Sequence, residues 1–242
     1  ASQGRFRALG LPPDRIGPVA NLKSAAKAAP ASATLPFPRA TTLLAASTHE
    51  GEEEIVLSAF ARAHHENPDL RLILAPRHPR RRDQVNRLIA TTGLTSATRS
   101  RNDVPRADTV IYHADTMGEM DLWYAAAGLC LVGGSLVDKG GHTPFEPAAH
   151  NAAILHGPHT ANSAPAYDAL RAAGASVEVR TAEELAAAIL RLADPARQAD
   201  LARAASEALA GLSATGGLTP FYTALSQATG HPALAGPAPD RQ

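Results

Sequence analysis

The sequence has little of several features that mark common classes of protein. Its 242 residues include one cysteine, Cys130, so no disulfide can form within the chain and a reducing environment is expected. Aromatic residues make up 4% of the chain, and the 23 basic residues equal the 23 acidic ones. Nucleic-acid-binding surfaces use stacked aromatic rings and an excess of positive charge. The composition therefore argues against a nucleic acid partner.

Several motifs of catalysis are also absent from the sequence. Neither G-x-G-x-x-G nor G-x-x-x-x-G-K-[ST] occurs, which argues against a dinucleotide-dependent dehydrogenase and a P-loop enzyme. The histidines form no H-E-x-x-H, and His156 and His159 have a turn spacing rather than the spacing of helical metal ligands. No apolar run approaches the ~18 residues that a membrane-spanning helix needs. We expect neither a bound metal nor a cofactor.

The middle of the chain is a regular alternation of strand-like and helix-like segments. Strands are expected at 42–47, 70–75, 96–99, 109–113, 128–132, 153–156 and 176–179. Helices are expected at 51–66, 80–92, 117–127, 144–150, 161–173, 181–193, 196–210 and 220–229, with Gly211 ending the seventh. Such alternation predicts βαβ units. The fold class is therefore α/β, with a Rossmann-like parallel sheet flanked by helices.

Composition divides the chain into three parts. Residues 1–40 contain a segment rich in Ala, Pro and Ser and are predicted to be a connection or linker. Residues 41–230 carry the alternation and are predicted to be a nucleotide-binding domain. Residues 231–242, rich in Pro, Gly and Ala, are predicted to be a flexible tail.

One stretch, residues 129–150, organises the rest of the chain. A buried-type strand ends at Val132 and runs into the loop Gly133-Gly134-Ser135. Thr143 has the position of a helix N-cap, Pro144 of the first helical residue, and Glu146 of the third. A helix N-terminus at the end of a sheet favours an anion, which predicts a nucleotide or sugar phosphate site. The T-x-x-E spacing also fits a capping box, so a purely structural role for Glu146 stays open.

The loops that follow the predicted strands hold nearly all of the chemically interesting residues. Ligands of parallel sheets bind at this edge, outside the carboxyl ends of the strands. Arg77, on a stiff loop between Pro76 and Pro79, can bind a phosphate, although it also fits a surface arginine in a basic run. Gly118 allows a ring or a phosphate to come close. The carboxylates at 50–54 resemble metal ligands, but acidic residues are also favoured in the first turn of a helix.

Six segments of these loops resemble one known family in their order along the chain. They are ASTHEGEE, APRHP, ADTMGEM, VGGSL, GGHTPFEPAA and GPHT. This order is similar to that of the 3-deoxy-D-manno-octulosonic acid (Kdo) transferases of lipid A biosynthesis. The resemblance runs from about Asn21 to the helix after Thr181, and it covers only the carboxyl-terminal half of such an enzyme. It implies the carboxyl-terminal domain of a two-domain glycosyltransferase of the GT-B architecture.

The resemblance implies an activity and partners. The enzyme transfers Kdo from CMP-Kdo to the lipid A precursor, with inversion and without a catalytic metal. It works at the cytoplasmic face of the bacterial inner membrane, through peripheral contact. The carboxyl-terminal domain binds CMP, while the acceptor and the catalytic base belong to an amino-terminal domain that this sequence does not resemble.

The resemblance also implies roles for individual residues in binding CMP-Kdo. Pro76 and Arg77 would lie at the phosphate and base of the nucleotide, and Met117, Gly118 and Glu119 close to the cytidine. Glu146 would accept hydrogen bonds from the ribose hydroxyls. The remaining residues of the implied donor site are Gly133, Gly134, Ser135 and Thr143. Thr143 stands where the family usually has Asn, which leaves its contact with the donor open.

The chemistry of the residues agrees with this mechanism. Departure of CMP leaves negative charge on a phosphate, which N–H groups and Arg77 can stabilise. An acceptor hydroxyl must also lose a proton to a base. The nearest candidates, Glu50 and Glu119, both fit helix starts better, so we expect no catalytic residue here and no transfer by this chain alone. Two alternatives remain: a non-catalytic nucleotide-binding module and a domain similar to UDP-sugar epimerases.

Overall fold

The computed structural model describes residues 2–15, 35–215 and 218–230, and its contacts divide the chain into two units. Residues 26–209 form one unit, here called the sheet unit. Residues 1–25 and 210–242 form the other, in which helices α1 (Ser2–Ala8) and α9 (Leu218–Thr229) are described. Much of the predicted linker and all of the predicted tail, 231–242, fall outside the described residues. The predicted domain bounds therefore stay a prediction.

Within the described residues, seven strands form one sheet in which every neighbouring pair is parallel. The strands are β1 (Thr42–Thr48), β2 (Arg71–Pro76), β3 (Ser96–Thr98), β4 (Ile111–His113), β5 (Leu129–Val132), β6 (Ala153–His156) and β7 (Val177–Glu178). Their order is β3-β4-β2-β1-β5-β6-β7, so the direction of winding reverses between β1 and β5. The predicted α/β class is confirmed, and this reversal marks the position where such sheets bind ligands.

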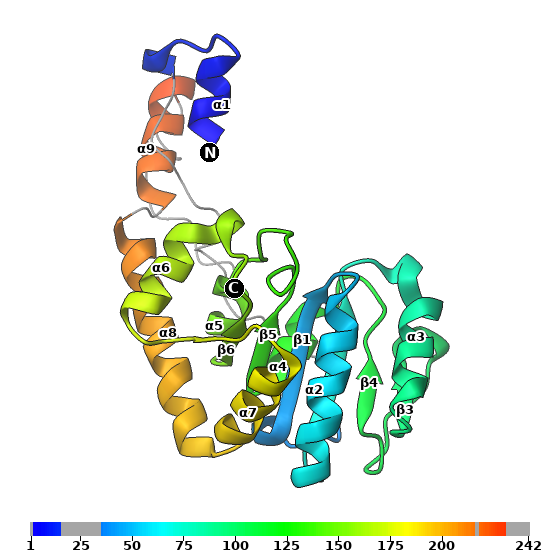
Figure 1. Cartoon of the computed structure of the whole chain (residues 1–242). Coiled ribbons are helices and arrows are strands. Elements are labelled where there is room, and N and C mark those ends of the chain that lie inside the picture. Colours follow the sequence, from blue (N-terminus) through cyan, green and yellow to red (C-terminus); the bar gives the residue numbers. More distant parts are fainter. Residues whose placement is uncertain (1, 16–34, 216–217, 231–242) are drawn as a thin grey trace. The chain divides into compact units, whose positions relative to one another are not determined.

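Helices cover both faces of the sheet (Figure 1). One face packs against α2 (Glu52–Glu66), α3 (Arg82–Thr91) and α7 (Ala182–Leu192), which bury their apolar sides against alternate strand residues such as Leu43, Leu72 and Leu131. The opposite face carries α4 (Met120–Ala126), α5 (Phe145–Ala149) and α6 (Ala164–Ala172). Helix α8 (Pro195–Thr215) contacts both sides, because Leu201 packs with the apolar residues of the first face and Ser206 donates to the carbonyl of Ala148 in α5. Because both faces are covered, strands β1, β2, β5 and β6 are almost entirely buried, and they are apolar runs in the sequence.

The sequence predicted most elements to within a few residues, and the differences have local causes. Helix α4 begins at Met120 instead of residue 117, because Gly118 has a φ of +82° and cannot lie inside a right-handed helix. Helix α8 continues through Gly211 to Thr215, so the prediction that Gly211 ends a helix was wrong. On α2, Val56 and Leu57 are buried while Ile55 is half-buried.

No helix among the described residues is both long and apolar enough to cross a membrane.

Candidate functional site

The loops that follow β1, β2 and β5 meet at the position where the sheet reverses. Ala46 pairs with Val132, and the N–H of Gly133 then donates to the carbonyl of Ala46 at 2.8 Å. A Cβ atom on Gly133 would clash with the backbone of Ser47, so only glycine allows this approach. On the other side of β1, the N–H of Arg77 donates to the carbonyl of Thr48 at 2.9 Å. The backbone thus brings three of the predicted loops together.

The glycine-rich loop after β5 is held by a carboxylate of this chain. Glu52 is fully buried in the first turn of α2. Its Oε2 accepts from the N–H groups of His49 at 2.8 Å and Gly134 at 2.7 Å, and its Oε1 from those of Ser135 at 3.0 Å and Leu136 at 2.9 Å. The backbone N–H groups of residues 134–136 in this loop are therefore bonded to Glu52. These hydrogen bonds hold the loop against the start of α2.

Ser135 links this loop to the next one along the edge of the sheet. Its side chain is buried, and the hydroxyl donates to the carbonyl of Val132 while accepting from the N–H of Gly157 at 2.8 Å. The N–H of His159 donates to the carbonyl of Ser135 at 3.0 Å. These contacts account for Ser135 structurally, and its predicted contact with the donor stays a prediction.

The start of α5 differs from the prediction. Pro144, not Thr143, is the N-cap, because the carbonyl of Pro144 accepts the N–H of Ala148. No side chain caps this described helix, and the N–H of Phe145 lies 3.5 Å from Oγ1 of the buried Thr143, which is a weak contact. The expectation that Thr143 caps the helix was wrong. The helix begins at Phe145, one residue later than expected, and Pro144 precedes it with φ −86° and ψ −2°.

Glu146 lies in the first turn of α5, on the face of the sheet that carries Cys130. The residue is exposed at the surface. Burial raises the pKa of Tyr124, and the nearby charges of Cys130 and Glu146 raise it further. Burial also raises the pKa of Cys130, again with a contribution from Glu146, so this thiol is an inert core group.

The loop after β4 presents Met117 and Gly118 to solvent and ties down Glu119. Met117 is 67% exposed. Nη2 of Arg99 donates to Glu119 at 2.6 Å, and the hydroxyl of Thr116 donates to the same carboxylate. The hydrogen bond from Arg99 lowers the pKa of Glu119, which suits an ion pair better than a general base.

The acidic side chains near the start of α2 also have partners within the chain. Glu53 is buried and accepts from Arg81 at 2.7 Å and from Thr48 at 2.9 Å. Glu50, the other candidate base, accepts from the amide of Gln84 at 3.0 Å. Among the described residues, no group of three or more possible ligands is arranged to hold a metal ion.

The predicted donor-site residues all lie at the carboxyl-terminal edge of the sheet, because all of its strands are parallel. Pro76 is the last residue of β2, pairs with Thr48 and is buried, whereas Arg77 is exposed. Four of the predicted residues, Pro76, Arg77, Gly133 and Gly134, flank the end of β1. Thr143 and Glu146 follow β5, while residues 117–119 follow β4, which β2 separates from β1. Their roles in binding stay predictions.

The structure also places three histidines together at the same edge of the sheet, which no sequence pattern predicted. His49 follows β1, His78 follows β2 and His142 belongs to the loop after β5. Nε2 of His49 lies 3.0 Å from Nε2 of His142, and the His78 ring stands edge-on to His49 with 5.8 Å between centroids. Only the order of the strands brings them together.

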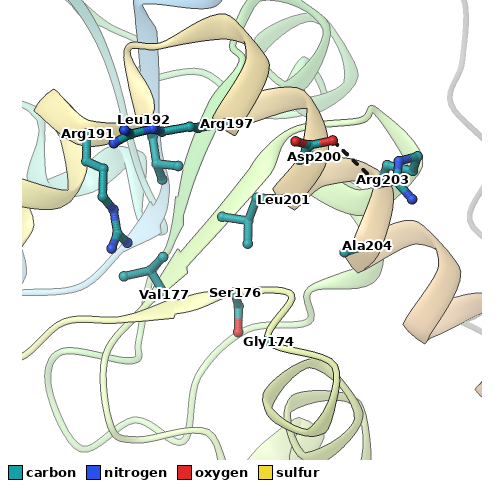
Figure 2. Close-up of a pocket in the computed structure, with 10 residues that line it drawn as sticks. All are labelled: Gly174, Ser176, Val177, Arg191, Leu192, Arg197, Asp200, Leu201, Arg203 and Ala204. Atoms are coloured by element: carbon teal, nitrogen blue, oxygen red, sulfur yellow. Dashed lines mark hydrogen bonds and ion pairs between the residues drawn. The ribbon is translucent and has the colours of Figure 1, made fainter.

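The described part of the chain also has a cavity far from these loops. It has a volume of about 720 Å³ and lies beside the amino-terminal end of β7, between that strand and helices α7 and α8 (Figure 2). Val177, Leu192 and Leu201 form an apolar floor, and Arg203 on its rim is paired with Asp200 at 3.4 Å. It contains none of the predicted site residues.

Comparison with known proteins finds the same family that the loop motifs resemble. A 3-deoxy-D-manno-octulosonic acid transferase of Haemophilus influenzae is 41% identical over 119 residues, which is 49% of this chain and 28% of that protein. A crystal structure of the C-terminal CMP-Kdo binding domain of WaaA from Acinetobacter baumannii is 33% identical, with a TM-score of 0.66. The match includes 70% of this chain and 89% of the A. baumannii domain.

The fold is also found outside this group. The C-terminal domain of a glycosyl transferase group 1 family protein from Francisella tularensis matches with a TM-score of 0.50 at 13% identity, over 70% of this chain and 84% of that one. No family model matches the chain. This chain spans less than a third of the length of the H. influenzae relative. Its match to the A. baumannii domain, in contrast, is nearly complete. The chain therefore belongs to the 3-deoxy-D-manno-octulosonic acid transferase family and has the Rossmann-like fold of the carboxyl-terminal, GT-B-type domain of these enzymes.

Proposed function

We propose that this chain is the donor-binding domain of an inverting glycosyltransferase that moves Kdo from CMP-Kdo to the lipid A precursor. The observation that carries the proposal is the convergence of the loops after β1, β2 and β5 where the sheet reverses. The similarity to a CMP-Kdo binding domain supports CMP-Kdo as the ligand. We further propose that the full enzyme works at the cytoplasmic face of the inner membrane, where its acceptor is a lipid.

The residues at this edge suit the departure of a nucleotide. The glycosidic bond to the phosphate breaks, and the electron pair stays on CMP as negative charge. Arg77 is exposed beside the end of β1 and can pair with that charge through its planar guanidinium. Preorganised positive groups lower the barrier for such a step without a metal ion.

The chain offers no convincing base for the acceptor hydroxyl. Of the two candidates, Glu50 is bonded to Gln84 and Glu119 to Arg99. We therefore propose that the base and the acceptor site belong to an amino-terminal domain, and that the isolated chain binds CMP and transfers nothing. Transfer of Kdo to a lipid acceptor by the purified chain would contradict this proposal.

Calorimetric titration with CMP, UDP and NAD tests the ligand. We expect a clear preference for CMP, and we expect Arg77→Ala to weaken CMP binding about tenfold through loss of a charged contact. Arg80→Ala is the matched control, because Arg80 is an exposed neighbour in the same basic run. Equal binding of all three nucleotides would favour a non-catalytic module, and a preference for UDP would favour an epimerase-like domain.

A further inference from the structure

The histidine cluster at the edge of the sheet has a specific geometry. The rings of His49 and His142 are nearly parallel, at 14°, with 5.2 Å between centroids and 3.0 Å between their Nε2 atoms. A Cβ atom on Gly134 would lie 3.3 Å from Cδ2 of His49 and 3.4 Å from Cδ2 of His142, so both rings flank Gly134. The backbone of that loop and of His49 is fixed by Glu52. The two rings are therefore held together by the fold.

Two imidazole nitrogens at hydrogen-bond distance share one hydrogen. In the neutral pair, one Nε2 donates and the other accepts. The donating ring can take up a second proton on its Nδ1 and keep the shared hydrogen bond, so the pair can gain one positive charge without rearranging. A further proton, on Nε2 of the accepting ring, would remove the acceptor and break the bond. The pair is thus built to switch between zero and one positive charge.

The surroundings decide which of these states is favoured. Burial is the largest effect on His49 and lowers its pKa. The charges of His78 and Lys139 also lower this pKa, whereas the carboxylates of Glu52 and Glu53 raise it. The net effect favours the neutral pair near neutral pH. An anion placed against the cluster would reverse that preference, because its charge offsets the repulsion from His78 and Lys139.

We propose that His49, His78 and His142, with Lys139, form a subsite for the anionic group of the donor, and that binding of this group is coupled to uptake of a proton by the His49–His142 pair. This inference rests on the proposed function, because the subsite lies at the ends of β2, β1 and β5, where the loops of the donor site converge. The anionic group is the phosphate or the sugar carboxylate. A metal is the other common ligand of clustered histidines, and within the described residues no such site is formed.

The test measures proton uptake directly. Free CMP is a poor probe, because its own phosphate titrates near pH ~6. Cytidine 5′-methylphosphate carries one fixed negative charge, free Kdo carries the carboxylate, and cytidine is the uncharged control. Each is titrated into the wild-type chain by calorimetry in buffers of different ionisation enthalpy. We expect proton uptake with at least one anionic probe and none with cytidine, and the responding probe identifies the group that the subsite binds.

Substitutions connect the uptake to the histidines. We expect His49→Gln and His142→Gln to weaken the responding probe about tenfold and to abolish proton uptake, with cytidine binding unchanged. His65→Gln, an exposed position on α2, is the control and should match the wild type. Binding of the anionic probes by the wild type without proton uptake would overturn this inference and leave the proposed function intact. A wild-type chain that binds no cytidine nucleotide would overturn both.

Discussion

Neighbouring carboxylates in one helical turn can have different roles, as the start of α2 shows. Glu52 and Glu53 are buried, while Glu54 is exposed. The helix dipole favours all three equally, so it explains their presence and not their differences. Glu52 faces four N–H donors and Glu53 faces the guanidinium of Arg81. The structural role of each residue is set by what lies opposite it.

We predict that Glu52→Gln strongly destabilises the sheet unit. The new amide places its own N–H groups against backbone N–H groups, which leaves buried donors without acceptors and costs ~2–4 kcal/mol. The free energy of unfolding, measured with urea, tests this. Glu54→Gln is the matched control and should change that free energy by less than ~0.5 kcal/mol. Equal effects of the two substitutions would show that the contacts of Glu52 contribute little.

At the residue scale, the sequence predicted the edge of the sheet that holds the candidate site and missed part of its composition. Arg77 and the Gly133-Gly134 pair could be placed at this edge because each follows a recognisable strand. The contact between His49 and His142 joins residues 93 positions apart, and no local spacing predicts it. The carboxylate of Glu52 in the glycine loop is equally non-local. A local pattern predicts the donors of a loop, and the order of strands decides which group they bind.

At the scale of elements, α7 and α5 show when a cap prediction succeeds. Thr181 and Glu184 also have the T-x-x-E spacing, and Oγ1 of Thr181 accepts from the N–H of Glu184 at 3.2 Å, as this spacing predicts. The same spacing at Thr143 and Glu146 gave no cap, because Pro144 occupies the N-cap position. The carboxylate of Glu184 accepts from the N–H of Arg180, one residue before the expected partner. The T-x-x-E spacing alone therefore does not decide whether the threonine side chain caps the helix.

We predict that Thr181→Ala lowers the free energy of unfolding by ~1 kcal/mol, because the substitution removes the acceptor for an N–H of the first turn of α7. Thr181→Ser keeps a hydroxyl and should retain most of the stability. Urea titration followed by circular dichroism measures both variants. A serine variant as unstable as the alanine variant would indicate that the methyl group, and not the hydrogen bond, matters at this position.

Strands were easier to predict than helix ends, for a physical reason. A strand buried on both faces must be apolar throughout, so its sequence shows its place directly. A helix end depends on backbone conformations that several residue types can adopt. Gly118 with its positive φ delayed the start of α4, while Gly211 was accommodated inside α8.

At the scale of the whole molecule, burial of titratable groups couples stability to pH. His113 at the end of β4 is fully buried, and burial lowers its pKa to about 4, against a partial increase from Asp115. Burial also lowers the pKa of His156 at the end of β6. As a neutral ring, His113 donates from Nδ1 to Oδ1 of Asn86 at 2.7 Å. His156 donates from Nδ1 to the carbonyl of Gly157 at 2.8 Å, so its Nε2 accepts from the hydroxyl of Ser176 at 3.1 Å. The sheet holds these histidines uncharged.

The sign of the resulting pH dependence follows from proton binding. A pKa that is lower in the folded state means that the unfolded chain binds more protons below the ordinary value of 6.5. Stability therefore increases with pH and is lost as the pH falls from about 6.5 toward about 4. Glu119, whose pKa is lowered by its hydrogen bond with Arg99, acts in the same direction at still lower pH. All of these groups favour the folded state at neutral pH.

We predict that the free energy of unfolding falls by on the order of 2 kcal/mol between about pH 7.5 and about pH 5. The double variant His113→Gln, His156→Gln should show a smaller fall, because glutamine keeps a polar side chain and takes up no proton. His65→Gln should retain the full slope, since His65 is exposed. Urea titrations across this range supply the measurement. If the double variant keeps the wild-type slope, the protons that unfold the domain bind elsewhere, and the coupling between sheet burial and pH fails.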